Sequence, residues 1–389
     1  MRRSNIRLLV TICVFLALFV LLLCLYSDQN HYLFSQKTNS YSIDLNFDRK
    51  LLDKDYELDL EDEDVLVFLH MQKTGGTTFG KHLVKNLDID QPCECIKGKK
   101  KCNCLTRKQT VWLFSRYSTG WACGLHADWT ELKGCVDKEM DKQEGLHRKR
   151  RFHYITILRD PVRRYISEWK HVQRGATWKA AKLYCNGRQA SLEEVPFCFE
   201  GSTWKGVTLE EFIKCKFNLA NNRQTRMLAN LSKVNCYNGT GMNEELRQRL
   251  LLESAIENLK NMSFFGLTEH QRDTQLLFQH TFHIKFSKDF EQFNKTHSEK
   301  AEHKVTEEQI SLIENLNALD VKLYKFAKRL FEERVKVMTE EMNESESTPV
   351  SVVESKSGGE QHNEGLGVRE QHNETLDYVE ELFKEASKK

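Results

Sequence analysis

A glycine-rich turn carries the strongest chemical signal in the chain. It comprises Met71 to Thr77 (MQKTGGT), between the apolar run Val65–His70 and a stretch with apolar residues at helical spacing. A turn that opens a helix in this way offers unpaired backbone N–H groups and the positive end of the helix dipole to an anion. Gly75 and Gly76 let the backbone approach a phosphate, and Lys73 adds a mobile positive charge. The segment predicts a phosphate-type anion site, with an ordinary tight strand-to-helix turn as the alternative.

The same turn nearly matches the P-loop of nucleoside triphosphatases. Gly75, Gly80 and Lys81 fit the pattern G-x4-G-K, but His82 stands where that loop needs a hydroxyl group for Mg²⁺. The apolar run also ends too early for Gly75 to begin such a loop. We therefore expect a different phosphate-bearing ligand, with Lys73 ahead of the glycines as its cation.

The elements that must hold this turn alternate between strand and helix. Three short apolar runs are typical of buried parallel strands: Val65–His70, Tyr154–Asp160 and Phe264–Leu267. Amphipathic helical spacing is found near residues 208–232, 243–261 and 268–282 and over Glu307–Met338, and Pro161 marks the start of a further helix. The alternation predicts an α/β domain with a central parallel sheet flanked by helices.

The N-terminal segment predicts attachment to a membrane. Leu8–Tyr26 is an uncharged apolar run long enough to cross a hydrocarbon core of about 30 Å, and Arg2, Arg3 and Arg7 precede it. Because positive residues stay on the cytosolic side, we expect a single-pass type II signal anchor at residues 8–26, with 1–7 cytosolic and the rest lumenal. A cleaved signal peptide is the alternative, although the run is longer than a usual h-region and no small-x-small cleavage site follows it.

Composition divides the remainder into a stem, a domain and a tail. Residues 27–62 are polar and acidic and predict a stem, 63–338 hold the strand–helix alternation, and 339–389 predict an acidic, mostly disordered tail with a possible short helix at Leu376–Ala386. The 58 basic and 56 acidic residues nearly cancel, which argues against a wholesale nucleic-acid binder, so we expect no nucleic-acid partner.

Cysteines and glycosylation sequons agree with a lumenal location. Apart from Cys13 and Cys24 in the apolar run, every cysteine falls between Cys93 and Cys236, and their number is even. This predicts up to five disulfides in one domain, with a zinc site in the cluster Cys93-x-Cys95-x6-Cys102-x-Cys104 as the alternative. N-x-S/T sequons occur at Asn230, Asn238, Asn261, Asn294, Asn343 and Asn373.

Long strings of the sequence resemble the heparan-sulfate 6-O-sulfotransferase family. They are HMQKTGGTTFGKHL, WLFSRYSTGWACGLHADWTEL, ITILRDPVRRYISEWKHVQRGATW, LANNRQTRMLA and FFGLTEHQRDTQLLF, within about residues 60–335. The resemblance implies a P-loop-kinase-like sulfotransferase fold in a Golgi membrane enzyme. It implies transfer of a sulfuryl group from 3′-phosphoadenylyl sulfate (PAPS) to the 6-hydroxyl of glucosamine in heparan sulfate, with no metal required.

The resemblance also implies which residues bind the donor. The 5′-phosphosulfate loop corresponds to His70, Met71, Gln72, Lys73, Thr74, Gly75, Gly76, Thr77 and Thr78, and Lys73 would neutralise charge on the leaving phosphate oxygen. Arg159 and Ser167 would hold the 3′-phosphate, although by itself Arg159–Asp160 also fits a structural ion pair. Arg163 and Arg164 are expected to be solvated or to face a partner. A late donor segment maps onto Glu291, Gln292, Phe293, Thr296 and His297, where relatives carry Arg at the last position. A glycan at Asn294 would obstruct the donor, so we expect that sequon to be unused.

For the acceptor, the resemblance implies His126 in CGLHADW as the general base that takes the proton of the attacking hydroxyl. Glu131 and His171 are the nearest alternatives for this role. The acceptor set of the family corresponds to Lys100, Lys101, Arg116, Trp121, His171 and Trp178, which combine cations for sulfates with flat surfaces for sugar rings.

Three rival functions remain open at this stage. One is a sulfotransferase acting on another hydroxyl, such as the 2-O position. Another is a metal-dependent glycosyltransferase, for which Asp88-Ile-Asp90 matches the D-x-D pattern by letters alone. The third is a heparan-binding membrane protein without catalysis. The sequence does not predict the oligomeric state or the preferred sulfation pattern of the acceptor.

Overall fold

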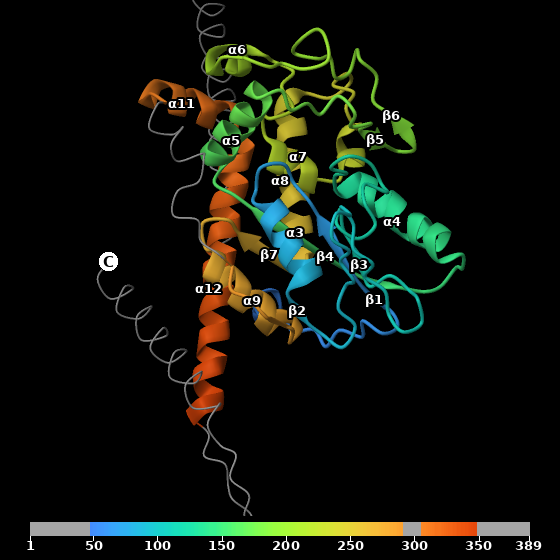
Figure 1. Ribbon diagram of the computed structural model, residues 1–389. Helices are drawn as coiled ribbons and strands as arrows, with labels where there is room; N and C mark the ends of the chain where they lie inside the picture. Colours follow the sequence, from blue (N-terminus) through green and yellow to red (C-terminus); the bar gives the residue numbers. More distant parts are fainter. Residues whose placement is uncertain (1–46, 291–304, 348–389) are drawn as a thin grey trace, which may run out of the picture. The chain divides into compact units, whose positions relative to one another are not determined.

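A parallel four-stranded sheet lies at the centre of the computed structural model, which describes residues 47–290 and 305–347 (Figure 1). Its order is β3 (Leu113–Phe114), β1 (Asp64–Leu69), β4 (Arg151–Leu158) and β7 (Phe264–Leu267), and all neighbours are parallel. Every residue of β1 and β7 is buried, as expected for strands covered on both faces. The predicted α/β class and the three predicted strands are confirmed.

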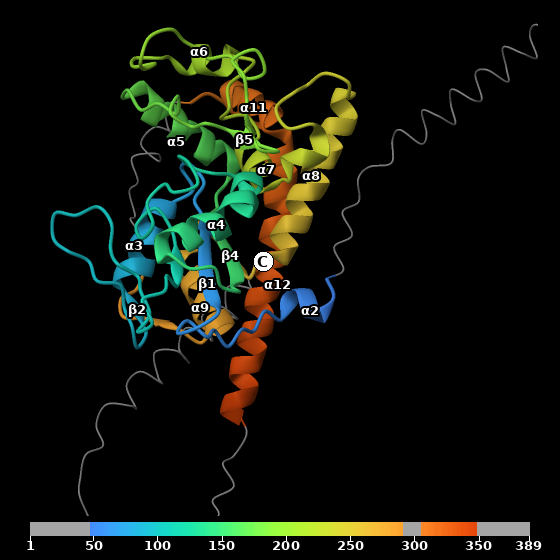
Figure 2. The same ribbon diagram turned by 90° about the vertical axis from the view of Figure 1, so that its right-hand side faces the viewer.

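Helices cover both faces of this sheet. In Figure 2, α3 lies on one side of the strands and α8 and α12 lie together on the other. The helices are α2 (Arg49–Leu52), α3 (Gly76–Lys85), α4 (Trp129–Glu144), α5 (Pro161–Gln173), α6 (Leu209–Lys214), α7 (Arg223–Leu228), the 3-10 helix η1 (Leu231–Val234), α8 (Glu244–Asn261), α9 (Gln271–Phe282), α11 (Glu307–Leu316) and α12 (Ala318–Ser347). Within the described ranges there are also two small antiparallel pairs, β2 (Leu87–Asp88) with β8 (Lys285–Phe286) and β5 (Tyr184–Cys185) with β6 (Arg188–Gln189).

The predicted helix at Glu307–Met338 is wrong in its continuity and its end. It is broken at the buried Asn317, whose Oδ1 accepts from the N–H of Asn222 and whose Nδ2 donates to the carbonyl of Ile313. Asn222 Oδ1 in turn accepts from the N–H groups of Leu319 and Asp320 at the start of α12. These side chains replace the hydrogen bonds that a continuous helix would make. The helix α12 then runs to Ser347, beyond residue 338.

Of the amphipathic stretches predicted earlier in the chain, some correspond to single helices and one does not. Residues 208–232 are not one element but α6, α7 and η1 in succession, whereas 243–261 and 268–282 correspond closely to α8 and α9. Capping residues explain where these elements begin: Thr208 forms a capping box with Glu211, and the side chain of Asn243 accepts from Glu245 N.

Part of the predicted stem packs against the domain. Arg334 Nε in α12 donates to the carbonyl of Leu51 in α2, and the Tyr56 N–H donates to the carbonyl of Thr281. The ring of Tyr56 also stacks on Phe282 at 5.9 Å. The folded part therefore includes residues 48–62, ahead of the start at residue 63. The apolar run Leu8–Tyr26 and the tail from 348 onward lie outside the described residues, within which no helix has both the length and the apolarity to cross a membrane.

Five disulfides confirm the cysteine prediction and exclude the zinc alternative. The pairs are Cys93–Cys104, Cys95–Cys102, Cys123–Cys135, Cys185–Cys236 and Cys198–Cys215. All four sulfurs of the proposed zinc cluster are consumed in the first two bonds. The loops between the sheet strands, which have little regular structure, are therefore held covalently.

Candidate active site

A cavity of about 490 Å³ opens where the carboxyl ends of β1 and β4 meet. It brings together residues from four separate parts of the sequence: the turn after β1, the loop after β3, the end of β4 with α5, and the loop after α5. Its lining consists of His70, Gln72, Lys73, Gly75, Gly76, Thr77, Thr78, Arg116, Trp121, Leu125, His126, Arg159, Ser167, His171 and Trp178.

The turn after β1 is shaped by its glycines. Gly75 has φ +77° and precedes the first residue of α3, a left-handed conformation that side chains disfavour. A Cβ at Gly76 would lie 2.5 Å from Cδ2 of His70, so only glycine fits beneath that ring. Met71 and Thr74, which the family resemblance assigns to the donor loop, are buried and do not line the cavity. The N–H groups of Thr78 and Phe79 donate to the carbonyl of Gly75, which leaves those of Gly76 and Thr77, within the part of the chain that the structure describes, open to an anion.

Lys73 supplies a positive charge that the protein itself does not neutralise. Its Nζ has no hydrogen-bond or ion-pair partner among the described residues, and its backbone has φ +68°. Burial lowers the pKa of Lys73, and the nearby Arg174 and Arg159 lower it further. A half-buried ammonium group in such surroundings is stabilised by an anionic ligand.

Arg159 is held at the cavity by hydrogen bonds to its backbone and side chain. Its N–H donates to Gln224 Oε1 and its carbonyl accepts from Gln224 Nε2, both at 2.9 Å. Its Nη1 donates to the carbonyl of Lys73, and its Nε lies 3.8 Å from Glu269 Oε1. Asp160 instead caps α5 by accepting from the N–H of Arg163. Ser167, in the second turn of α5, lines the same cavity.

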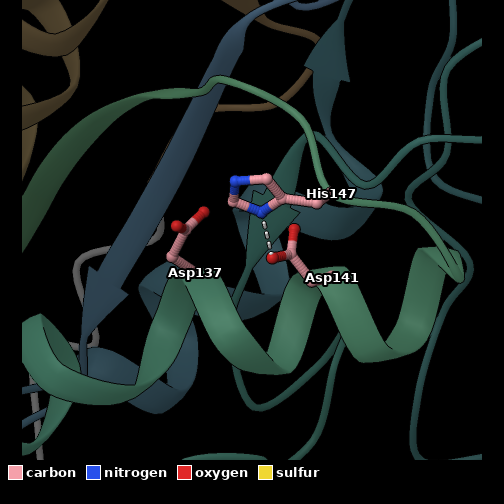
Figure 3. A group of neighbouring side chains, drawn as sticks. All are labelled: Asp137, Asp141 and His147. Atoms are coloured by element: carbon pink, nitrogen blue, oxygen red, sulfur yellow. Dashed lines mark hydrogen bonds and ion pairs between the residues drawn. The ribbon is translucent and has the colours of Figure 1, made fainter.

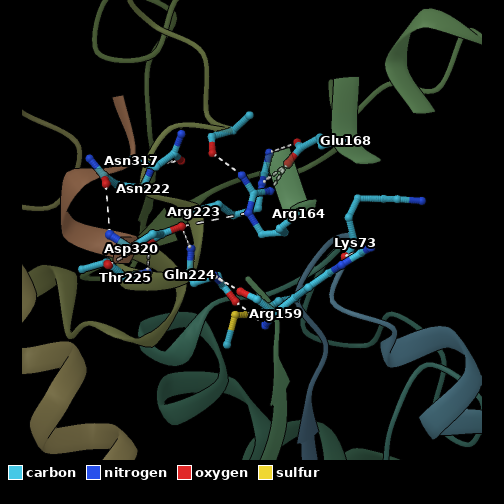
Figure 4. A network of polar contacts seen from close by, with 12 residues as sticks. Lys73, Arg159, Arg164, Glu168, Asn222, Arg223, Gln224, Thr225, Asn317 and Asp320 are labelled. Carbon is cyan, nitrogen blue, oxygen red and sulfur yellow. Dashed lines mark hydrogen bonds and ion pairs between the residues drawn. The ribbon is translucent and has the colours of Figure 1, made fainter. Parts of the chain in front are cut away.

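A buried ionic network behind the cavity was not anticipated from the sequence (Figure 4). Glu168 accepts hydrogen bonds from Arg164, Arg223 and the indole N–H of Trp178. Burial alone would raise the pKa of Glu168, but Arg223 and Arg164 hold it at about 2. The expectation that Arg164 is solvated is therefore wrong, since its side chain is fully buried.

The network continues into α12 through Asp320. Its carboxylate accepts from the N–H groups of Gln224 and Thr225 and from the hydroxyl of Thr225. Gln224 is also the residue that holds Arg159, so the start of α12 is linked to the cavity by side-chain hydrogen bonds (Figure 4). The sequence gives one sign of this arrangement, since charged residues stand among apolar ones in the segment RRYISEW (163–169).

His126 has the geometry of a neutral proton acceptor. Its Nδ1 lies 2.9 Å from the carbonyl oxygen of His70, which only accepts, so Nδ1 carries the proton and Nε2 is left with its lone pair. Burial lowers the pKa of His126 to about 4. The ring is enclosed by Trp121 at 4.5 Å and Trp178 at 5.3 Å between ring centroids.

The two alternative bases differ in their placement. Glu131 does not line this cavity: its carboxylate accepts from the N–H groups of Asp128 and Tyr184, and burial and Asp128 raise its pKa to about 7. It forms the capping box of α4 with Asp128. His171 does line the cavity and lies 5.6 Å from the ring of Trp178.

The predicted acceptor residues divide into two groups. Arg116, Trp121, His171 and Trp178 line the cavity, and the guanidinium of Arg116 lies 5.0 Å from the Trp121 ring. Lys100 and Lys101 are exposed and lie outside it, although the side chain of Lys101 runs past Gly120, next to Trp121. The late donor residues Glu291, Gln292, Phe293, Thr296 and His297 fall outside the described residues.

One further group of side chains consists of residue types that can bind a metal ion, but here they form ion pairs. Asp137, Asp141 and His147 lie close together on and after α4 (Figure 3). Arg150 Nη1 donates to both carboxylates, and His147 Nδ1 lies 2.6 Å from Asp141. These ion pairs already neutralise the cluster, which is not part of the cavity.

Comparison with known proteins decides the family. Residues 56–327 match the sulfotransferase family. Heparan-sulfate 6-O-sulfotransferase 3-B of Danio rerio is 55% identical over 77% of this chain and 72% of its own length. Heparan-sulfate 6-O-sulfotransferase 1 of Cricetulus griseus is 55% identical over 73% and 71%, and heparan-sulfate 6-O-sulfotransferase 3 of Homo sapiens is 56% identical over 74% and 62%. The chain belongs to the heparan-sulfate 6-O-sulfotransferases. It is therefore an enzyme of the sulfotransferase family, and every residue that lines its cavity lies inside the matched region.

Proposed function

We propose that the chain transfers a sulfuryl group from PAPS to the 6-hydroxyl of glucosamine units in heparan sulfate. The observation that carries this proposal is the pairing, in one cavity, of an ammonium group without a protein partner and a neutral imidazole with a free lone pair. The first suits an anionic donor and the second suits an alcohol acceptor. The names of the relatives supply the acceptor and the position on it.

The donor side of the cavity fits a ligand with several negative charges. The turn His70–Thr78 would hold the 5′-phosphosulfate, Arg159 and Ser167 the 3′-phosphate, and residues 291–297 the rest of the nucleotide. When bound, PAPS supplies an activated sulfuryl group on a phosphate leaving group. Lys73 and the N–H groups at the start of α3 stabilise negative charge on the leaving side without a metal ion, in the manner of an oxyanion site.

On the acceptor side, His126 removes the proton of the attacking hydroxyl. The bond from Nδ1 to the His70 carbonyl fixes the ring, so that Nε2 is the accepting atom. A pKa of about 4 keeps the ring neutral at the pH of the secretory pathway. Anionic substrates beside the ring raise that pKa, because a nearby negative charge stabilises the imidazolium form. His126 is thus neutral before the substrates bind, and its basicity increases once they are bound.

The proposal includes the cellular setting. A type II anchor at residues 8–26 would place the domain in the Golgi lumen, where PAPS-dependent modification of polysaccharides is expected from the family. The five disulfides support an oxidising compartment.

Transfer of label tests the reaction and its position together. The detergent-solubilised full chain is incubated with labelled PAPS and N-sulfated, O-desulfated heparan chains in EDTA, and the products are cleaved to disaccharides. We expect label at the glucosamine 6-position. Label only at another hydroxyl would contradict the position, a need for metal would contradict the mechanism, and PAPS binding without any transfer would identify a non-catalytic binder.

A further inference from the structure

A second and larger cavity adjoins the one that holds Lys73 and His126. It has a volume of about 860 Å³ and lies between the start of α4 and the β5–β6 hairpin. Trp121 and Leu125 line both cavities, so the two meet at these side chains. We call this second cavity the α4 groove. Its walls include Cys123, Cys135 and Cys185, whose disulfides join the loop after β3 to α4 and the β5–β6 hairpin to the segment after η1.

The α4 groove carries cations that the protein does not neutralise. Lys133 and Lys182 both line it, both are exposed, and neither has a carboxylate partner among the described residues. The single acidic side chain in its lining, Glu131, is occupied by the N–H groups of Asp128 and Tyr184. A groove with unpaired lysines and an engaged carboxylate attracts anions.

Aromatic surfaces accompany these cations. Trp129 and Tyr184 line the α4 groove, and the Lys133 ammonium lies 5.9 Å from the Trp129 ring. Trp121, at the junction with the active-site cavity, is 36% exposed. Flat, partly exposed rings next to free ammonium groups suit sugar rings that carry sulfate or carboxylate groups.

We propose that the α4 groove binds the part of a sulfated polysaccharide that extends, on one side, beyond the glucosamine that reacts. This inference rests on the proposed function, since it extends the same acceptor site across Trp121. Lys133 and Lys182 contact sulfate or carboxylate groups of the neighbouring units. Affinity for the acceptor therefore increases with chain length until the groove is filled.

The sequon at Asn230 lies in the lining of the α4 groove and gives an independent check. Asn230 Oδ1 accepts from the N–H of Ser232, which leaves Nδ2 available for a glycan. A glycan at this position would occupy the space that the polysaccharide needs. The proposal therefore requires that the active protein carries no glycan on Asn230.

The test compares short and long acceptors with the full chain and two double variants. Lys133→Ala with Lys182→Ala removes the cations of the α4 groove, and Lys138→Ala with Lys142→Ala removes two exposed lysines of the same helix that do not line it. Binding by calorimetry and turnover are measured with N-sulfated tetrasaccharides and dodecasaccharides.

We expect the groove variant to lose about 3- to 20-fold in affinity for the dodecasaccharide, the size expected for two partly exposed ion pairs. Its affinity for the tetrasaccharide and its kcat stay unchanged, and the control variant matches the unmodified protein. Equal effects on both lengths, no effect on either, or a glycan on Asn230 of the active protein in mass spectrometry would each overturn the proposal. Absence of transfer by the unmodified protein would contradict the proposed reaction alone, because the binding measurements still decide whether the groove is used.

Discussion

The two sides of the active-site cavity are built in different ways. On the donor side, the turn after β1 and Arg159 after β4 are continuous with the parallel sheet and are held by part-buried hydrogen bonds to Gln224 and Thr268. On the acceptor side, Trp121, His126 and Trp178 come from loops that disulfides and single hydrogen bonds hold. A small donor of constant structure suits a site fixed by the sheet, whereas a long and variable acceptor suits an open, loop-built surface.

The two sides are also expected to differ in how mutations affect the stability of the protein, because of the buried ionic network. Glu168 joins both sides, because it binds two arginines of the folded core and the indole of Trp178. Asp320 and the two asparagines at the helix break connect the same region to α12. The donor side is therefore expected to be more sensitive to loss of buried charges, and the acceptor side to loss of exposed charges.

The largest effect is expected when the network is broken. Glu168→Gln removes the negative charge that Arg164 and Arg223 share, and breaking such a buried pair costs about 3–5 kcal/mol of the free energy of unfolding. Chemical denaturation under non-reducing conditions measures this change. Glu210→Gln, which disrupts an exposed pair with Lys214, serves as the control and leaves stability nearly unchanged. Equal stability of the two variants would refute the bracing role of the network.

Next in size is the loss of the donor-side cation. Lys73→Ala lowers kcat by about 10²–10³, the usual effect of removing one group that stabilises developing charge. Steady-state transfer assays measure it, with Lys81→Ala on the exposed face of α3 as the matched control. Near-normal turnover of Lys73→Ala would show that the turn does not serve the donor.

A smaller effect is expected at the acceptor rim. Lys100→Ala with Lys101→Ala raises KM for heparan acceptors about 3- to 20-fold and leaves kcat unchanged, because these exposed lysines lie beside the cavity and not in it. The effect shrinks as salt is added. Lys97→Ala with Lys99→Ala in the same loop controls for general basic charge, and an identical rise in that variant would remove any special role of Lys100 and Lys101.

The smallest effect concerns the protonation of His126, which is expected not to change with pH in the free protein. Between pH 8 and 5 the free protein keeps His126 neutral, since burial lowers its pKa to about 4, whereas the exposed His147 takes up a proton because Asp141 raises its pKa above 6.5. Histidine ¹⁵N chemical shifts, assigned with His126→Ala, measure both groups in one sample. Protonation of His126 near pH 6.5 would contradict its buried, neutral state.

The turn that forms the donor side could be predicted from the sequence. The buried side chains that hold this side in place mostly could not. The turn His70–Thr78 is contiguous, and its glycines and lysine have a local physical meaning. Arg164 was misjudged because its pairing with Glu168 one helical turn away gives no sign of burial, which depends on Arg223 and Asp320 from distant parts of the chain. The helix break at Asn317 was missed for the same reason, since its partner Asn222 is distant in the chain.

The acceptor side was accessible through the resemblance alone. An isolated histidine such as His126 has no local signature, and its tautomer depends on the carbonyl of His70, far away in sequence. The even number of cysteines predicted disulfides but not their pairing, because pairing depends on the folded path of the loops. Pairwise contacts of this kind require the tertiary structure.

The most direct test of the account separates donor binding from proton removal at His126. Calorimetry with PAPS and transfer to heparan acceptors are measured for His126→Ala, with Lys73→Ala as the opposite case. The account predicts that His126→Ala binds PAPS within about twofold of the unmodified protein while transfer falls by about 10²–10⁴, and that Lys73→Ala weakens PAPS binding. Loss of PAPS binding in His126→Ala, or transfer at nearly the normal rate, would contradict the division of the cavity into a donor side and an acceptor side.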